Sequence, residues 1–272
     1  MTTLALFVHD SYLPHIEANL KPRTVAEYRR LLDKTIVPDL GRKQVHKLTT
    51  RDVDQWHLAQ RKMAPIQANR ALAVLSGALT LAARWGDIPV NPAQGVQMAR
   101  EQPRDRYLTS DEVERLKAAL KRFSAQESAF ILTMLYTGAR PGELISARWE
   151  WIAGSRLELP DSKTGRRTVF LPKPARGAMA AIPGIGQTSG LIFPDVNPTT
   201  LWRRLRVAAG LEGCRLYDLR HTFASAALEA RVSLEAVGQL LGHSKTQTTR
   251  RYVHLAPRVG DDAAEKIAAV LN

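Results

Sequence analysis

The sequence is poor in cysteine and lacks long apolar runs. Cys214 is the only cysteine among 272 residues, which excludes a disulfide framework and a cysteine-based structural zinc site and suits a reducing cytoplasm. No uninterrupted apolar run approaches the roughly 18 residues that a membrane span needs. The first residues, MTTLALFVHDSYLPHIEANLKPR, reach acidic residues and proline too early for a secretory signal. We therefore expect a soluble, cytoplasmic protein.

Acidic residues are outnumbered along the whole chain. The sequence has 39 Lys and Arg residues against 26 Asp and Glu residues, a formal charge of +13. Residues 1–100 hold 14 basic and 8 acidic side chains and residues 101–272 hold 25 and 18, so no single tail carries the excess. Such a chain suggests a polyanion as partner, most often nucleic acid, although many basic proteins are only soluble enzymes. Charge thus indicates a class of partner and leaves the activity open.

The length fits two domains, at roughly 100 to 200 residues per domain. Residues 1–99 carry helical patterns, including a Thr24–Glu27 pair typical of a capping box and a long apolar series near residues 65–85. The stretch 89–106 has three prolines and no apolar period, which is typical of a linker. We predict a helical domain at residues 1–99, a linker at 100–105 and a second domain at 106–272.

The second domain mixes helical and extended patterns. Thr109 and Glu112 form a capping box before another helix, and helical patterns cover most of the remainder. Two short strand-like runs, 156–159 and 168–171, flank the turn-rich segment DSKTGR. They predict a β-hairpin with Lys163 at its tip. The expected fold class is mainly α with a small β-hairpin in the C-terminal domain.

Four segments of the second domain concentrate polar residues. They are TGARPGEL around Arg140, SKTG around Lys163, LYDLRHTFAS around Arg220, and LGHSKTQTTRRYVH with His243 and Tyr252. Taken singly, most of these residues have an ordinary structural interpretation. Arg140 resembles a surface arginine, Lys163 a solvated lysine at a hairpin tip, and Tyr252 a core tyrosine.

Arginine in these segments has a second interpretation. Arg140 lies in a turn between helices, where a guanidinium can bind phosphate bidentately, and Glu143 could orient it across one helical turn. Arg220 stands in an otherwise apolar helical stretch, where an arginine is usually paired or functional. A structural salt bridge to Asp218 or Glu143 is the alternative. His221 points elsewhere and is interpreted as structural.

Together, in this order and with this spacing from His243 to Tyr252, the four segments resemble the tyrosine recombinase family, also called phage integrases, which includes the Xer-type resolvases. The resemblance implies a site-specific DNA recombinase built as a C-shaped, two-domain clamp. Residues 1–99 would be the helical, SAM-like core-binding domain and residues 106–272 the catalytic domain.

The resemblance also implies roles for single residues. Tyr252 would attack the scissile phosphate and form a 3′-phosphotyrosyl intermediate, which conserves the bond energy so that DNA reseals without ATP. Arg140 and Arg220 would bind the non-bridging oxygens, with His243 as a third donor. His243 follows a glycine at a helix end, which should expose its ring. Lys163 would protonate the departing 5′-oxygen. No cofactor or metal is implied.

Tyr217 departs from the family pattern, because the position three residues before the second arginine is usually histidine. A tyrosine can hydrogen-bond to the phosphate or the nucleophile, but it cannot act as the near-neutral base that an imidazole provides. Tyr217 could also simply pack where the histidine would stand. The general base therefore stays open, and a catalytically impaired DNA-binding protein of the same fold is one alternative.

The resemblance implies that the protein binds double-stranded DNA at the nucleoid. It also implies that four copies of the chain assemble as a homo-tetramer on two recombination sites. The segment 261–272 would dock on a neighbouring subunit or pack on its own domain. The resemblance leaves open the target sequence, accessory DNA-bending proteins, directionality, and the choice among an integrase, a Xer-like resolvase and an inversion enzyme. A topoisomerase or hairpin-end resolvase with the same tyrosine chemistry is the second alternative.

Overall fold

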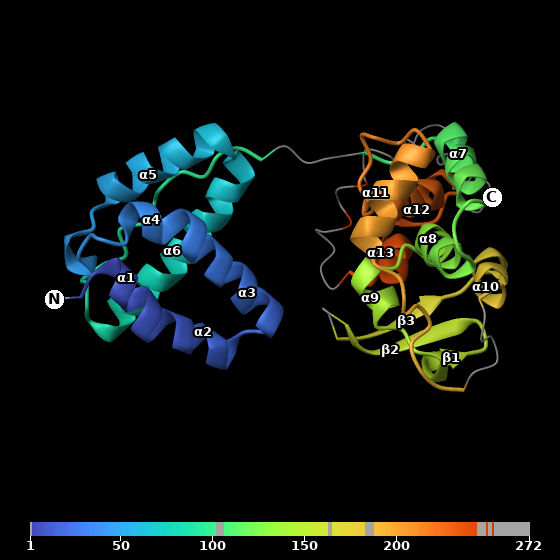
Figure 1. Cartoon of the computed structure of the whole chain (residues 1–272), viewed down its shortest axis with the longest axis horizontal. Coiled ribbons are helices and arrows are strands. Elements are labelled where there is room, and N and C mark those ends of the chain that lie inside the picture. Colours follow the sequence, from blue (N-terminus) through green and yellow to red (C-terminus); the bar gives the residue numbers. More distant parts are fainter. Residues whose placement is uncertain are drawn as a thin grey trace, which may run out of the picture. The chain divides into compact units, whose positions relative to one another are not determined.

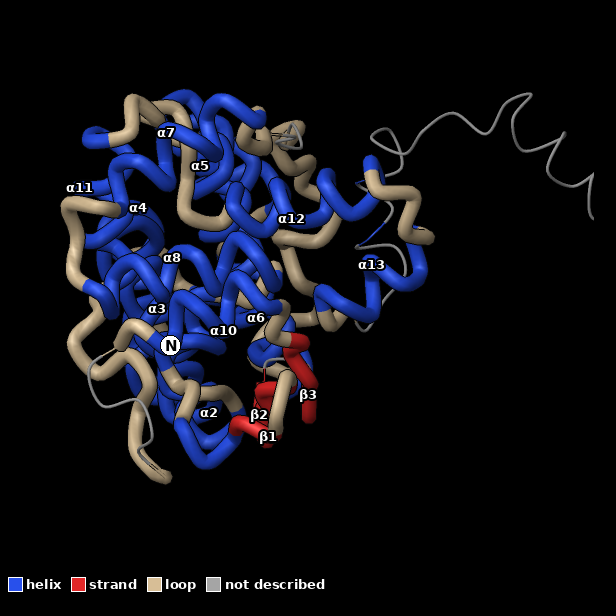
Figure 2. The backbone as a smooth tube through the Cα atoms, turned by 90° about the vertical axis from the view of Figure 1, so that its right-hand side faces the viewer, coloured by secondary structure: helices blue, strands red, loops and turns tan. Residues whose placement is uncertain are grey.

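Helices make up most of the chain, and three short strands lie side by side in its C-terminal half (Figure 1, Figure 2). The structure is a computed structural model that describes residues 2–101, 106–162, 165–182, 188–243, 249 and 252. The chain divides into two units, Met1–Pro103 and Arg104–Asn272. The prediction of a mainly α fold with a small sheet in the second unit is confirmed.

The first unit contains α1 (Leu4–Phe7), α2 (Leu13–Asn19), α3 (Pro22–Leu31), α4 (Val37–Leu40), α5 (Thr50–Met63) and α6 (Pro65–Trp85), with π-helical turns at Val8–Tyr12 and Leu32–Ile36 and a 3-10 turn at Val45–Lys47. The second unit contains α7 (Ser110–Leu120), α8 (Ala125–Thr137), α9 (Pro141–Ile145), a 3-10 turn (Trp149–Trp151), β1 (Ile152–Ala153), β2 (Arg156–Ser162), β3 (Gly165–Phe170), α10 (Lys173–Ala180), α11 (Pro198–Ala208), α12 (Asp218–Glu229) and α13 (Leu234–Leu241). None of the helices within the described ranges is long and apolar enough to cross a membrane.

Helix α6 runs through the core of the first unit. Its 21 residues begin with Pro65, whose fixed φ suits the first helical position, and end at Gly86, which takes a left-handed φ of 84°. The expected apolar series is buried, with Leu75, Leu79 and Ala82 fully enclosed. A helix with small and apolar residues at this spacing packs on its neighbours along most of its length.

The start of α3 differs from the expected capping box. Lys21 is the N-cap and Pro22 the first helical residue, so Thr24 lies within the first turn. Glu27 pairs with Arg30 one turn later, and both side chains are exposed. Proline sets this helix start because its missing N–H needs no partner at that position.

Asn69 of α6 joins the helix to the last described residues of its unit. Its amide nitrogen donates to the carbonyl of Ala99 at 2.8 Å and to Glu101 Oε1 at 2.9 Å, and its oxygen accepts from the Ala99 amide at 2.8 Å. The same oxygen lies 3.2 Å from Nε2 of the buried His57 on α5. One buried side chain therefore satisfies both backbone polar groups of Ala99.

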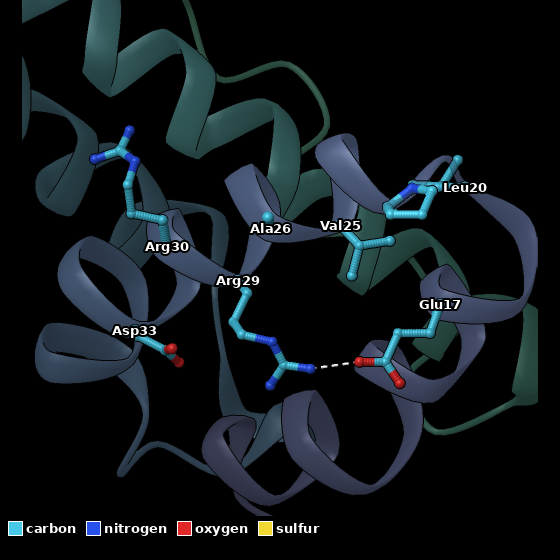
Figure 3. A pocket seen from close by; sticks show the side chains of 8 residues that line it. Glu17, Leu20, Val25, Ala26, Arg29, Arg30 and Asp33 are labelled. Carbon is cyan, nitrogen blue, oxygen red and sulfur yellow. Dashed lines mark hydrogen bonds and ion pairs between the residues drawn. The ribbon is translucent and has the colours of Figure 1, made fainter. Parts of the chain in front are cut away.

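A surface pocket lies between α2 and α3 (Figure 3). Arg29 reaches across it and forms an ion pair with Glu17. Arg30 and Asp33 also line it, so both signs of charge meet there. Because Glu17 already pairs with Arg29, we do not interpret this pocket as an anion-binding site.

The second unit surrounds α8. The strands form an antiparallel sheet in the order β1-β2-β3, and Leu157 pairs with Val169 and Leu159 with Arg167. These four side chains are buried. The pairing of β2 with β3 confirms the predicted hairpin, while Lys163 at its tip lies outside the described residues. The capping box before α7 is also confirmed, because Thr109 and Glu112 bond reciprocally.

Replacing Asn69 by alanine should destabilise the first unit by about 2–3 kcal/mol, because it leaves the buried N–H and C=O of Ala99 without partners. Chemical denaturation measures this loss, and hydrogen exchange should rise at the Ala99 amide. Asn19→Ala is the matched control, since Asn19 is exposed and bonds only locally, to the His15 carbonyl. Equal stability of the two variants would contradict the anchoring role.

Candidate active site

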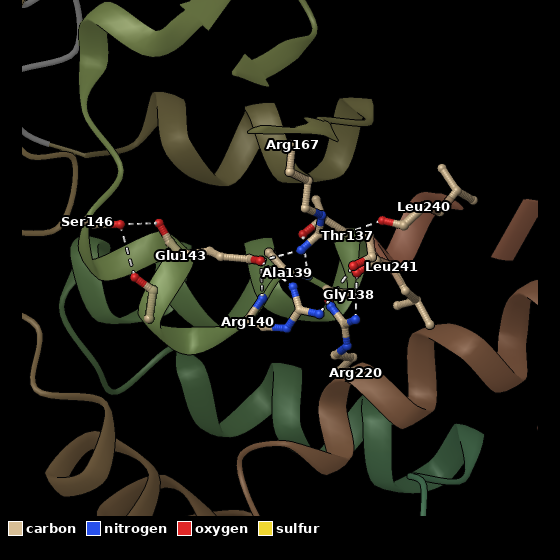
Figure 4. A network of polar contacts seen from close by, with 12 residues as sticks. Thr137, Gly138, Ala139, Arg140, Glu143, Ser146, Arg167, Arg220, Leu240 and Leu241 are labelled. Atoms are coloured by element: carbon tan, nitrogen blue, oxygen red, sulfur yellow. Dashed lines mark hydrogen bonds and ion pairs between the residues drawn. The ribbon is translucent and has the colours of Figure 1, made fainter. Parts of the chain in front are cut away.

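A buried carboxylate, that of Glu143, holds two arginines (Figure 4). Arg140 is the N-cap of α9 and Pro141 its first residue, which places Glu143 in the third helical position, where acidic residues cap helices. Glu143 Oε2 accepts from the Arg140 amide at 2.8 Å, and Oε1 accepts from Arg140 Nη1 at 2.6 Å. Arg167 of β3 donates to Oε2 from the opposite side. The predicted orientation of Arg140 by Glu143 is present.

Charge pairing keeps this carboxylate ionised. Burial by itself raises the pKa of Glu143, but attraction to Arg167 and hydrogen bonds from Arg140 and Arg167 outweigh it, so the pKa lies below its ordinary value. Burial lowers the pKa of Arg167, and the attraction of Glu143 opposes that effect. The side chains of Arg167 and Glu143 are only 4% and 6% exposed. Each would be a costly unpaired charge without the other.

Three guanidiniums meet three consecutive carbonyls at the end of α13. Arg167 donates to the Leu240 carbonyl at 2.8 Å, Arg220 to Leu241 at 2.6 Å, and Arg140 to Gly242 at 3.3 Å. The last carbonyls of a helix lack internal donors and form the negative end of its dipole. Gly242 ends the helix in the left-handed conformation, with φ 64°. The arginines therefore cap the C-terminal end of α13. His243 is the residue that follows the C-cap Gly242.

Arg220 is fully buried on α12. Its other nitrogen donates to the Gly138 carbonyl at 2.6 Å, where the chain turns with a φ of 62° between α8 and α9. Burial lowers the pKa of Arg220 to about 10, which leaves it charged at neutral pH. Glu143, one of the two carboxylates considered for a salt bridge with Arg220, pairs with Arg140 and Arg167 instead.

His243 is half-buried rather than exposed. Its Nδ1 lies 2.8 Å from the hydroxyl of Thr249, which is itself buried. Gly238 of α13 lies against the same hydroxyl, and a side chain there would meet it at 2.9 Å. A contact with Thr249 thus fixes the ring next to the capped helix end.

Tyr252 is 4% exposed within an apolar cluster that includes Leu228, Val237 and Leu241. The alternative of a core tyrosine therefore describes its ring correctly. Its hydroxyl is different, because it lies 2.7 Å from Nδ1 of His221. A residue whose ring is packed and whose hydroxyl meets an imidazole has both a fixed position and a partner for its proton.

Two residues of the site were missed by the sequence argument. The sequence predicts a structural role for His221 and gives no sign of its contact with the Tyr252 hydroxyl, which it reaches from α12. Arg167 was placed outside the strand, which begins at Gly165 and turns Arg167 to the same buried face as Val169. The alternation of β3 carries the signal for Arg167, since an arginine two residues before a buried valine faces inward. For His221 the helical spacing gave no comparable signal.

Tyr217, the departure from the family pattern, is the N-cap of α12 and 40% exposed. Its ring packs edge-on against His221 at 5.7 Å, and the Arg220 guanidinium lies 5.9 Å from its centre. Tyr217 and His221 are four residues apart, so they occupy the same side of the helix.

The structure thus brings Arg140, Glu143 and Arg220 together at the end of α13, with His243 following directly. The Tyr252 hydroxyl contacts His221, which follows Arg220 on α12. Lys163 lies outside the described residues. Within the described ranges no group of three or more His, Cys, Asp or Glu residues could hold a metal ion. Guanidiniums at a helix end with a nearby hydroxyl suit the binding and attack of a phosphoryl group.

Comparisons with known proteins identify the family of this chain. Residues 106–258 match the model of the phage integrase family, and residues 7–58 match the N-terminal SAM-like domain of phage integrases. Tyrosine recombinase XerC of Pseudomonas aeruginosa is 30% identical over 90% of this chain and 89% of its own length. A prophage phiRv2 integrase of Mycobacterium tuberculosis is 28% identical over 94% of this chain and 75% of its own length.

Solved structures share the fold at low identity. A lambda integrase dimer bound to a COC′ core site is 20% identical, with a TM-score of 0.80 over 96% of this chain and 98% of that chain. The Tn1549 transposon integrase in complex with circular intermediate DNA is 18% identical, with a TM-score of 0.73 over 98% and 99%.

Replacing Arg167 by methionine should destabilise the second unit by about 3–5 kcal/mol at pH 7, because it leaves a buried carboxylate with one partner fewer. The variant raises the pKa of Glu143, so Glu143 protonates earlier as the pH falls and the stability gap to wild type narrows toward pH 4. Denaturant unfolding across this pH range measures both effects.

Arg166→Met is the matched control, since Arg166 is exposed on the same strand. It should change stability by less than about 0.5 kcal/mol. The double variant R167M/E143Q should lose less than the sum of the single variants. A gap between wild type and R167M that stays constant with pH would show that Glu143 does not depend on Arg167.

Proposed function

Since this chain belongs to the phage integrase family and is a tyrosine site-specific recombinase, we propose that it cuts and rejoins double-stranded DNA through a covalent 3′-phosphotyrosyl bond to Tyr252. The family model covers residues 106–258, more than half of the chain, so the membership predicted from the four segments is confirmed. The covalent chemistry and the roles of single residues are the proposal.

One observation supports the proposal most directly. Arg140 and Arg220 donate to the consecutive carbonyls of Gly242 and Leu241 at the end of α13. The Tyr252 hydroxyl lies beside His221, the residue after Arg220 on α12. Two guanidiniums fixed by rigid backbone can bind the two non-bridging oxygens of one phosphate. They would offset the charge that develops as a fifth oxygen approaches phosphorus. His243, at the same helix end, would donate a third hydrogen bond.

The reaction exchanges one ester for another. The Tyr252 oxygen forms a bond to phosphorus, the bond from phosphorus to the 5′-oxygen breaks, and Lys163 gives that oxygen a proton. Phenol is a good leaving group, so a 5′-hydroxyl can reverse the step and reseal the DNA without ATP. We assign the charge stabilisation to arginines, so the reaction needs no metal or cofactor.

Partners follow from the same proposal. Basic side chains in both units would contact the phosphate backbone of double-stranded DNA, in agreement with the even charge along the chain. Lambda integrase is described as a dimer on a core site and as a tetramer on a Holliday junction. We propose a tetramer on two sites for this chain as well, acting on the nucleoid of the cytoplasm.

Covalent capture tests the function directly. Wild type is incubated with a pool of nicked duplexes of randomised sequence, in which cleavage releases a short strand and traps the intermediate. Protein-linked DNA should survive denaturation, should be unaffected by a metal chelator, and should be absent with Tyr252→Phe. The captured DNA then supplies the target sequence.

Other outcomes identify the alternatives. Wild type that binds DNA without forming an adduct would be a catalytically impaired DNA-binding protein. Adduct formation with relaxation of supercoiled plasmid but no strand exchange between two sites would indicate a topoisomerase or hairpin-end resolvase. An adduct that persists in Tyr252→Phe would overturn the assignment of the nucleophile.

A substrate with sulfur at the 5′-bridging position tests Lys163. Thiolate leaves without protonation, so Lys163→Ala should slow cleavage of the ordinary phosphate by about 100-fold or more and leave cleavage of the sulfur substrate near the wild-type rate. Rates of adduct formation on both substrates measure this. Lys173→Ala, a lysine at the start of α10, is the control. Equal slowing on both substrates would assign Lys163 to DNA binding.

A further inference from the structure

We propose that His221 is the general base that takes the proton from Tyr252, in place of the histidine that the family usually carries at the position of Tyr217. This inference rests on the proposed function, since it assigns a partner to the proposed nucleophile. The juxtaposition of the Tyr252 hydroxyl with the His221 ring carries it.

The contact has the geometry that a proton transfer needs. Tyr252 Oη and His221 Nδ1 are 2.7 Å apart, within the range of a direct hydrogen bond between a hydroxyl and an imidazole. The two ring centres are 5.5 Å apart and tilted by 55°. His221 is only 9% exposed and Tyr252 4%, so bulk water has little access to the pair.

Tyr217 shows why the base could move along the helix. Positions 217 and 221 lie one turn apart on α12, and the rings of Tyr217 and His221 touch edge-on at 5.7 Å. An imidazole at either position therefore faces the same region. A phenol such as that of Tyr217 cannot act as the near-neutral base that an imidazole provides. The Tyr217 ring instead supports His221 on the side toward solvent.

The step balances with one proton. As Tyr252 Oη bonds to phosphorus, its proton passes to His221 Nδ1, while the 5′-oxygen leaves with a proton from Lys163. In the reverse step His221 returns its proton to the phenolic oxygen, and Lys163 recovers its own. His221 must be neutral before attack, because only an unprotonated imidazole nitrogen can accept the proton.

Titratable and charged side chains lie near this imidazole on α12 and at Tyr252. Tyr217 and Tyr252 contact its ring, and Asp218 lies one turn earlier on α12, where it accepts from the Arg215 amide. Arg220 is the preceding residue and points to the carbonyls of Gly138 and Leu241. We assign the acidic limb of the rate profile to His221, because its Nδ1 contacts the nucleophilic hydroxyl directly.

The test measures adduct formation in single turnovers against pH, on the DNA captured with wild type. Wild type should lose rate as the pH falls through the pKa of His221 and level off above it. His221→Gln should be at least about 100-fold slower at pH 7, with a rate that rises with pH instead of levelling off, because no imidazole accepts the proton. His9→Gln, an exposed histidine of the first unit, is the control and should match wild type.

Moving the imidazole separates catalysis from structure. The double variant Y217H/H221Q restores a histidine one turn away and should recover at least about 10-fold of the lost rate together with the acidic limb. Tyr217→Phe tests the rival base. If the pH–rate profile of Tyr217→Phe lacks the acidic limb and that of H221Q retains it, Tyr217 accepts the proton and the proposal is wrong.

Wild-type protein provides a check that does not depend on the folding of a variant. The pKa of His221 is measured from its ring nitrogen signals by NMR, which are assigned in the isotopically labelled wild-type protein through its backbone signals. It must coincide with the midpoint of the acidic rate limb, and disagreement overturns the proposal. If wild type forms no adduct at all, the proposed function is wrong. If H221Q forms the adduct with the wild-type rate and pH profile, the proposed function stands and only the assignment of His221 as general base is wrong.

Discussion

A single carboxylate determines the geometry of the candidate site. Glu143 binds the backbone and guanidinium of Arg140 from its own helix and the guanidinium of Arg167 from the sheet. All three groups lose most of their contact with water, so the carboxylate and the two guanidiniums compensate one another's charge. Arg167 also donates to the Leu240 carbonyl, which connects the network to the end of α13. His243 lies just beyond that helix end. Sheet, turn and helix are thus fixed relative to one another by charge pairing rather than by apolar contact alone.

The network also leaves positive charge in excess. Arg140, Arg167 and Arg220 face one carboxylate, and the remaining attraction comes from helix carbonyls, which are dipoles and not ions. Repulsion from Arg140 and Arg167 adds to burial in lowering the pKa of Arg220. A bound phosphate would relieve this repulsion, which is the physical reason why such a pocket favours a phosphoryl group over a neutral ligand.

Local chemistry was predicted well where neighbours along the chain decide it. The capping box at Thr109, the end of α6 at Gly86 and the β2–β3 hairpin need only short-range hydrogen bonds and backbone preferences. The pair Thr24–Glu27 failed because Pro22 offered a better helix start two residues earlier. Arg167 was missed because its partner is 24 residues away, on a different element. His221 was missed for the same reason, since Tyr252 lies 31 residues further on.

The sequence by itself determined the family and the mainly helical fold with its hairpin, and it predicted part of the candidate site, because ordered motifs and periodicity can be recognised without knowledge of packing. It could not decide which of these side chains touch. Only the tertiary structure placed Arg167 on Glu143, gathered three arginines at the last carbonyls of α13, and brought His221 to the hydroxyl of Tyr252. Such contacts depend on how elements far apart in the chain pack, and no local pattern records that distance.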